Sequence, residues 1–252
     1  AGIWDLNGNV WEWQGGIRLV WGELQILANN DAADPDNPQN ATSTCWKAIN
    51  AADGALVDPE SKTTDSSAHV SGKTVKLDYV NNKWTYSTSI TNAKDESRSC
   101  AFYQVAADSS IGDAAKVMLR ALALLPDSDV TTDVYEGDYM WWNNGVAERC
   151  VYRGGNWNNG ANAGVFYLNG NNSRSNVNTN IGFRAALALF VYFLRAKAQQ
   201  KHQGKRDAFP GRQGQRYTLV LLCRWRPPGT PSKPRRLAVV CYAGRRGIRI
   251  LR

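Results

Sequence analysis

Residues that commonly carry metal and redox chemistry are scarce in this sequence. Its 252 residues include only two His and five Cys, and no two Cys form a CxxC pair. Neither His69 nor His202 has a partner at metal-ligand spacing, and we find no nucleophile elbow, phosphate loop or zinc motif. An odd number of Cys without regular spacing also argues against a disulfide-stapled secreted scaffold. The sequence therefore offers no motif for metal-dependent or nucleophilic catalysis.

Long apolar runs are absent as well. The longest, residues 185–194, has about half the length that a bilayer crossing requires. The opening AGIWDLNGN lacks the basic and apolar regions of a signal peptide. We therefore expect a soluble chain with no membrane span.

Negative charge is nearly missing from the last quarter of the chain. Residues 193–252 carry 16 Lys and Arg against one Asp, a net charge of +15, whereas residues 1–192 carry 14 against 21, a net charge of −7. We expect an acidic globular domain followed by a basic tail of low order. Clustered Arg and Lys neutralise phosphates, so a nucleic-acid arm is one interpretation of the tail. The tail lacks helical periodicity and has short apolar runs among Pro and Arg. These features favour a disordered arm or translated non-coding sequence instead.

The residue present in excess is Asn, between Arg153 and Arg184. Ten residues of this segment are Asn, among Gly, Ser and a few aromatics. Asn tolerates left-handed backbone and hydrogen-bonds its own main chain, which is typical of turns and loops. The segment begins with RGG-x-W and ends with IGFR. A loop held at both ends in this way is interpreted as a displayed surface on a rigid base, and a merely flexible stretch is the alternative.

These motifs carry a family resemblance. RGG-x-W, SRSN and GFRAA, with GNVWEW at residues 8–13, resemble the formylglycine-generating-enzyme-like (sulfatase-modifying factor) branch of the C-type lectin fold. The Asn-rich run is most similar to the variable region of diversity-generating-retroelement variable proteins, in which mutagenesis directed at adenines rewrites Asn codons. The resemblance covers roughly residues 2–186. It implies an α+β, C-type-lectin-like fold, truncated at its N-terminus, with residues 153–184 as the variable region.

The function implied by this resemblance is non-catalytic receptor recognition. The ligand would be an unknown protein or glycan on a cell surface, and the location a phage virion or a bacterial surface. The related oxidases hold copper on a Cys pair between the RGG and GFR motifs, because soft thiolates select Cu(I). That interval contains no Cys here, so we do not expect an enzyme. A degenerate relative of the oxidases and nucleic-acid binding through the tail are the alternatives.

The resemblance also implies roles for individual residues. The expected ligand-binding positions are Asn156, Asn158, Tyr167, Asn169, Asn171, Ser173, Asn176 and Asn178. Among them Tyr167 is the expected hot spot, because it is an amphipathic aromatic with few rotors. The residues expected to form the buried base are Trp157, Phe166 and Phe183. Arg153 and Arg184 are expected to tie the loop to buried carbonyls or carboxylates.

The region before Trp13 predicts one metal site. Asp5 and Glu12 supply carboxylates, with the backbone carbonyls of Gly8 and Val10 between them. Such hard oxygens suit Ca²⁺, and the related enzymes bind calcium at the matching positions. A structural Ca²⁺ is therefore the cofactor that the resemblance implies. The alternative is that Glu12 pairs with an Arg while the neighbouring Trp side chains pack.

Hydrophobic patterns predict the remaining elements. Alternation predicts hairpins, and an apolar face that includes Val117 predicts a helix. The expected elements are a hairpin at residues 17–27 around Gly22-Glu23, a short helix at 45–52, a hairpin at 75–87 around Asn81-Asn82, a helix from Asp113 that Pro126 ends, and a strand at 146–153.

Overall fold

The protein is described from a computed structural model, and the description covers residues 7–34, 36–129, 132–135, 137–183, 218–224, 236–244 and 247–251. The chain divides into two compact units, residues 1–191 and 192–252. In the second unit only the backbone of the strands is described.

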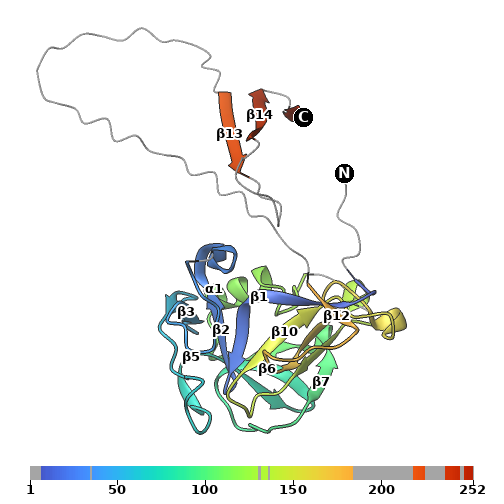
Figure 1. Cartoon of the computed structure of the whole chain (residues 1–252). Helices are drawn as coiled ribbons and strands as arrows, with labels where there is room; N and C mark the ends of the chain where they lie inside the picture. Colours follow the sequence, from blue (N-terminus) through green and yellow to red (C-terminus); the bar gives the residue numbers. More distant parts are fainter. Residues whose placement is uncertain are drawn as a thin grey trace, which may run out of the picture. The chain divides into compact units, whose positions relative to one another are not determined.

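One extended sheet dominates the first unit (Figure 1). Its strands are β1 (Trp11–Val20), β2 (Glu23–Leu27), β3 (Trp46–Ile49), β4 (Leu56–Val57), β5 (Ser71–Val80), β6 (Lys83–Ser89), β7 (Arg98–Ala101), β8 (Ala106–Ala107), β9 (Tyr139–Trp142), β10 (Arg149–Arg153), β11 (Leu168–Asn172) and β12 (Ile181–Gly182). Along its main path the order is β7-β9-β11-β10-β1-β2-β5-β6-β8. β12 pairs with β1, while β3 pairs with β2 and β4. Most neighbours are antiparallel, and three pairs (β1 with β12, β9 with β11, β6 with β8) are parallel.

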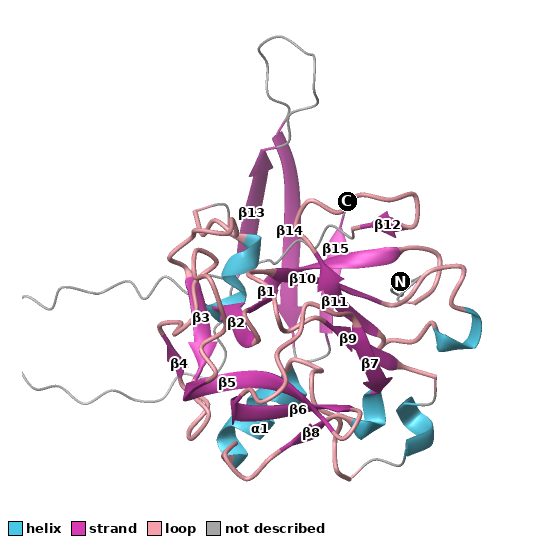
Figure 2. Cartoon of the chain, turned by 90° about the horizontal axis from the view of Figure 1, so that it is seen from below, coloured by secondary structure: helices cyan, strands magenta, loops and turns pink. Residues whose placement is uncertain are grey.

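Helical structure is sparse (Figure 2). The described residues contain one α-helix, α1 (Asp113–Ala121). The 3-10 turns are η1 (Ala28–Ala33), η2 (Phe102–Gln104), η3 (Thr132–Tyr135) and η4 (Gly160–Asn162). The expected α+β class is therefore wrong, because the described part of the chain is mostly β. None of its helices has the length and apolar character needed to cross a membrane.

The helix predicted at residues 45–52 is instead strand β3. Its residue Ala48 stands opposite Gln25 on β2, and Trp46, Ala48 and Ile49 are all buried. Pairing with an already formed sheet overrides a local pattern that alone is ambiguous between helix and strand.

The predicted helix from Asp113 forms but is shorter than expected. It ends at Ala121, two residues before Ala123 takes a left-handed φ of +52°. Leu119 is fully buried, whereas Val117 is 62% exposed, so Val117 does not belong to the buried face as predicted. The helix contributes buried Ala115 and Leu119 to the main core, and its partly buried Met118 packs against that core.

Both predicted hairpins are present. The turn between β5 and β6 is formed by Asn81 and Asn82, with φ values of +50° and +60°, and this pair of left-handed residues is typical of a type I′ turn. The turn between β1 and β2 uses Trp21 and Gly22, with φ values of +49° and +80°, one residue earlier than predicted. Turn chemistry thus places both hairpins almost correctly.

A buried carboxylate anchors the loop before β5. Glu23 on β2 is fully buried, and its carboxylate accepts hydrogen bonds from the N–H groups of Glu60 (3.0 Å) and Ser61 (2.9 Å). The hydroxyl of Thr74 also donates to it, at 2.6 Å. Because hydrogen bonds compensate a buried carboxylate for lost water, this arrangement holds the loop in one place against the sheet.

Glu60 in turn neutralises a buried cation. Lys76 on β5 is fully buried, and its Nζ donates to Glu60 Oε2 (2.6 Å) and to Thr74 Oγ1 (2.9 Å). Burial by itself raises the pKa of Glu60, but hydrogen bonds from the Lys73 N–H, Lys76 and Thr74 outweigh it and lower that pKa to about 2. The pair therefore stabilises the fold with Glu60 ionised.

We expect Glu60→Gln to lower the free energy of unfolding at neutral pH by about 2–3 kcal/mol, because Lys76 loses its directly bonded counter-charge. The folded-state pKa of Glu60 is about 2, below its ordinary value of 4.5. The stabilisation should therefore be present above about pH 4.5 and be lost as the pH falls towards 2 in the parent but not in the variant. Urea unfolding across this pH range measures both effects.

Adding Lys76→Met to Glu60→Gln should restore part of the lost stability, because the uncompensated charge is removed as well. Strictly additive losses from the two single changes would show that the pair is not coupled.

The second unit contains an antiparallel three-stranded sheet in the order β13 (Thr218–Arg224), β14 (Arg236–Gly244) and β15 (Gly247–Leu251). β13 runs opposite β14 from Thr218↔Tyr242 to Arg224↔Arg236. The prediction of a disordered tail of low order is wrong for these strands. Their β-branched and aliphatic residues favour strand pairing. The high Arg content of the whole tail made this local preference hard to recognise from the sequence. The rest of the tail lies outside the described residues.

Candidate functional site

Three loops meet where β1 begins. The Gly8 N–H donates to the Gly154 carbonyl (2.7 Å), and the Trp157 N–H donates to the Asn9 carbonyl (3.1 Å). On the other side, the Trp11 N–H donates to the Asn180 carbonyl (2.8 Å). Residues 8–11 thus join both ends of the Asn-rich segment. We call residues 156–163 and 173–180 the display loops.

The composition of the Asn-rich segment predicted turns and loops throughout, but the segment also contains strands. Strand β11 lies in its middle, between β9 and β10, and β12 pairs with the first residues of β1. Gly170 on β11 shows why a strand fits there: a Cβ at this position would lie 2.0 Å from the ring of Trp142. The absence of a side chain lets the fully buried indole pack directly on the backbone of β11.

An aromatic cluster supports the display loops. Trp11, Tyr152 and Tyr167 form a small core, against which Trp13, Trp141 and Ile181 pack. The ring of Trp11 lies 4.9 Å from that of Tyr167, and Trp13 meets Tyr152 edge-on at 4.3 Å. We call Trp11, Tyr152 and Tyr167 the aromatic base. Aromatic pairs in this geometry add about 0.5–1.5 kcal/mol beyond the area that they bury.

Tyr167 belongs to this base and not to the displayed surface. Only 6% of its surface is exposed, and burial raises its pKa. Its backbone also holds a display loop, because its carbonyl accepts a hydrogen bond from the Gly154 N–H (3.1 Å). The prediction that Tyr167 is the exposed hot spot is therefore wrong, since the turn before β11 directs this side chain inward.

Asn156 is likewise buried, with 4% of its surface exposed. Its Oδ1 accepts a hydrogen bond from the Asn158 N–H (3.0 Å), and its own N–H donates to Asn159 Oδ1 (2.7 Å). Such self-bonded amides build the turn, so Asn156 shapes the loop instead of facing a ligand as predicted.

Two aromatics expected in the buried base are exposed. Trp157 is 54% exposed and Phe183 is 79% exposed. The backbone of Trp157 is fixed by its bond to Asn9, and with Asn156 turned inward the next side chain points outward. Phe166 is partly buried and packs against the main core, stacked on Phe102 at 5.3 Å. The burial predicted for Trp157 and Phe183 is therefore wrong, and Arg184 lies outside the described residues.

The other predicted ligand-binding positions divide by exposure. The exposed ones are Asn158, Ser173 and Asn178, and the partly buried ones are Asn169, Asn171 and Asn176. The amide of Asn176 donates to the hydroxyl of Tyr152 (2.7 Å), which ties a display loop to the aromatic base. Asn169 Oδ1 accepts hydrogen bonds from the Asn171 N–H and the Asn172 side chain. The partly buried half of this set thus forms hydrogen bonds within the protein.

Arg153 fastens the start of the segment to the main core. Its Nη2 donates to the carbonyls of Leu122 and Ala123, both at 3.0 Å, beyond the end of α1. Burial lowers the pKa of Arg153 to about 10, against the opposing influence of Tyr86 and Asp138. The guanidinium stays charged at neutral pH and satisfies carbonyls that a helix end leaves unpaired.

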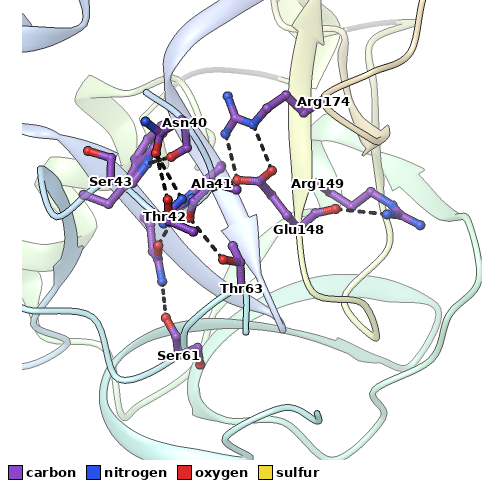
Figure 3. Close-up of polar contacts among 12 residues, drawn as sticks. Asn40, Ala41, Thr42, Ser43, Ser61, Thr63, Glu148, Arg149 and Arg174 are labelled. Atoms are coloured by element: carbon purple, nitrogen blue, oxygen red, sulfur yellow. Dashed lines mark hydrogen bonds and ion pairs between the residues drawn. The ribbon is translucent and has the colours of Figure 1, made fainter. Parts of the chain in front are cut away.

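Sequence reasoning missed an ion-pair chain at the second display loop. Arg174 donates through Nε (3.0 Å) and Nη2 (2.7 Å) to the two carboxylate oxygens of Glu148 (Figure 3). The same carboxylate accepts from Arg18 Nη1 at 2.8 Å. Burial raises the pKa of Glu148, but the hydrogen bonds and charges of both arginines outweigh it and lower that pKa. The SRSN motif was the available signal, because Arg174 is its Arg.

The predicted calcium site is only partly described. Gly8, Val10 and Glu12 lie in the turn that enters β1, and Asp5 lies outside the described residues. One carboxylate and two carbonyls are fewer than the roughly six to eight oxygens that Ca²⁺ takes. In the part of the chain that the structure describes, no three acidic, His or Cys side chains gather as a metal site would require. Calcium stays a prediction, which melts in Ca²⁺ and in a chelator can test.

We expect Tyr167→Ala to lower the free energy of unfolding by roughly 3–5 kcal/mol, because a buried aromatic is removed from a packed cluster. Trp157→Ala should change it by about 1 kcal/mol or less, because more than half of the indole is in solvent. Urea unfolding of the two variants, followed by circular dichroism, measures the difference. Equal losses would contradict the division between aromatic base and display loops.

The comparisons with known proteins add no family to this description. A scan of the chain against protein-family models found no match, and neither did a search of curated proteins. The resemblance noted above therefore stands on the RGG-x-W, SRSN, GFRAA and GNVWEW motifs themselves. Three of the four motifs, RGG-x-W, SRSN and GNVWEW, lie at the start of β1 or in the loops that adjoin it.

Proposed function

We propose that this chain is a non-catalytic protein that binds a ligand through its display loops and Phe183. One observation carries the proposal: exposed apolar side chains are frequent in this segment. Ten large hydrophobic side chains are exposed in the described part of the chain, and four of them lie between residues 157 and 183, at Trp157, Val165, Val177 and Phe183. Single exposed apolar residues are ordinary, but a group of them is typical of an interaction surface.

Backbone geometry brings the two aromatic members of this group to the same end of the sheet. The loop of Trp157 is bonded to Asn9, and the segment before Phe183 pairs with β1 at Trp11 and Glu12. Both therefore flank the first residues of β1. An exposed Trp is among the side chains that most often dominate binding energy, so Trp157 takes the anchoring role that Tyr167 was predicted to have.

The surface offers almost no free charge. Between residues 156 and 183 the only charged side chain is Arg174, and it is paired with Glu148. Binding here would rest on apolar anchors surrounded by the amide and hydroxyl groups of residues such as Asn158, Ser173 and Asn178. Such an interface depends little on ionic strength, because screening acts mainly on charged groups.

Two buried thiols support a non-catalytic role. Burial raises the pKa of Cys150 to about 11 and also raises the pKa of Cys100. Thiols with raised pKa values carry little thiolate at neutral pH, and the thiolate is both the nucleophile and the metal ligand. Neither cysteine is suited to the copper-dependent oxidation of the related enzymes.

The resemblance extends this proposal to a class of proteins and a type of ligand. We propose that the chain is a variable protein of a diversity-generating retroelement, and that its ligand is a protein or glycan on a cell surface. A phage virion or a bacterial surface is the location that fits such a role. The degenerate-enzyme and nucleic-acid alternatives gain no support from the display loops.

A pull-down from bacterial surface extract tests the proposal. The parent should capture a protein or glycan from the extract. We expect the double variant Trp157→Ser, Phe183→Ser to capture at least about tenfold less of it, because the two aromatic anchors are removed. Both changes lie on the surface, so the melting transition should hardly move. Val117→Ser is the matched control, because it removes another exposed apolar side chain, on α1. It should bind like the parent.

The salt dependence separates this surface from the basic tail. Capture that persists between about 50 and 300 mM salt and is lost in the double variant supports the proposal. Capture that survives the double variant and falls steeply with salt would assign binding to the tail and overturn it.

A further inference from the structure

A cavity of about 630 Å³ opens between two loops on another part of the first unit, at residues 41–46 and 58–64. Six of the residues that line it carry hydroxyl groups: Thr42, Ser43, Thr44, Ser61, Thr63 and Thr64. Arg18 and Trp46 are among the other residues that line it. The volume lies within the roughly 300–1,000 Å³ of small-molecule sites. Figure 3 shows several of these side chains and the bonds that hold them.

The loop at residues 41–46 is fixed before any ligand binds. The carbonyl of Ala41 accepts hydrogen bonds from Arg18 Nη1 (2.9 Å) and from Thr63 Oγ1 (3.1 Å). The indole N–H of Trp46 donates to the Asn40 carbonyl (3.0 Å), and the Arg18 guanidinium lies 4.2 Å from the centre of the Trp46 ring. These bonds also join the two loops to each other.

The opposite loop is equally constrained. Glu23 accepts a hydrogen bond from the Ser61 N–H, and Gln25 donates through Nε2 to the Ser61 carbonyl at 2.8 Å. Arg18 Nε donates in turn to Gln25 Oε1 at 3.0 Å. A cavity whose two walls are already ordered loses little conformational entropy when a ligand enters. The site is therefore pre-formed.

The hydroxyl groups keep unused hydrogen-bonding capacity of both kinds. Ser43 Oγ accepts from the Cys45 N–H, which leaves its own O–H to donate. Thr63 Oγ1 donates to Ala41, which leaves its lone pairs to accept. The hydroxyls of Thr44 and Thr64 form no hydrogen bond with any described residue. Because a hydroxyl both donates and accepts, this wall complements a ligand that does both.

Charge at the cavity is largely paired. Arg18 is bonded to Glu148 at 2.8 Å, and Asp58 is bonded to Lys47. Lys62 adds one further positive charge to the lining. A phosphate or sulfate carries negative charge and mainly accepts hydrogen bonds, so it is held best by unpaired cations such as Arg. The balance of charge and the hydroxyl wall favour a polyhydroxylated ring over an inorganic anion.

We propose that this cavity binds a saccharide through the hydroxyl groups of the 41–46 and 58–64 loops. The site does not share its lining with the display loops, and its occupation does not depend on their function. The ligand is a single sugar ring or a short oligomer, either neutral or carrying a carboxylate that Lys62 would neutralise.

Amide chemical-shift mapping on the full chain tests the proposal. The probes are glucose, N-acetylglucosamine and glucuronic acid, each titrated to about 50 mM, a concentration at which a site with a millimolar dissociation constant is nearly saturated. At least one should shift the amides of residues 42–44 and 62–64. A preference for glucuronic acid would identify the acidic form of the ligand, and a preference for the other two sugars the neutral form.

The double variant Thr44→Val, Thr64→Val removes two hydroxyls that make no hydrogen bond with the described residues, so it should fold like the parent. We expect it to weaken saccharide binding at least about fivefold, because each hydroxyl lost removes a neutral hydrogen bond. Thr88→Val on β6 is the matched control, outside the cavity, and should bind like the parent. Unchanged affinity in the double variant would overturn the proposal.

Inorganic phosphate is the competing probe. If phosphate shifts the same amides and displaces the sugar, the cavity is an anion site and the proposal is wrong. Shifts confined to other surfaces, or none with any of the three sugars, would refute it equally.

Discussion

Strand β1 hydrogen-bonds to three other strands, and the rest of the first unit depends on that arrangement. It is antiparallel to β10 along most of its length, antiparallel to β2 over residues 17–20, and parallel to β12 at its first residues. Glu12 therefore lies between Arg153 on one side and Gly182 on the other. Both ends of the Asn-rich segment are held against one strand, which gives irregular loops a regular foundation.

Packing reinforces this foundation with a second, smaller core. The aromatic base is separate from the main cluster, where Trp84, Tyr86 and Trp142 are fully buried. Side chains on the outside of the display loops can therefore change without disturbing the main core. What must be kept are the buried aromatics and the turn-forming amides, of which Asn156 is the clearest case. This division would suit a protein whose surface is rewritten while its fold persists.

Buried charge has a similar positioning role in this protein. Arg153 binds the carbonyls beyond α1, Glu148 joins Arg18 to Arg174, and Glu23 holds the loop at Ser61. Each brings a segment that lacks regular structure to a defined place on the sheet. Groups of this kind contribute less to net stability than to specifying one arrangement, because desolvation offsets much of their attraction. The loop positions around β1 and around the hydroxyl-lined cavity both result from them.

Local features were predictable from the sequence alone. The Asn81-Asn82 turn follows from the preference of Asn for left-handed backbone, and the hairpins follow from period-two alternation, both of which act over a few residues. The motifs at residues 8–13 and 153–157 carry the same resemblance, and in the structure hydrogen bonds join them. The attachment of Arg153 to buried carbonyls was also anticipated.

Only the tertiary structure decided which of these side chains face solvent. Tyr167 and Trp157 are both aromatics beside Gly and Asn, and nothing in their local sequence distinguishes the buried one from the exposed one. The difference arises because Tyr167 precedes β11 and packs on Trp11, whereas Trp157 lies within the turn that the buried Asn156 closes. Likewise, residues 46–49 form a strand because β2 is there to pair with them. Burial and strand pairing depend on partners that are distant in sequence, so local patterns do not determine them.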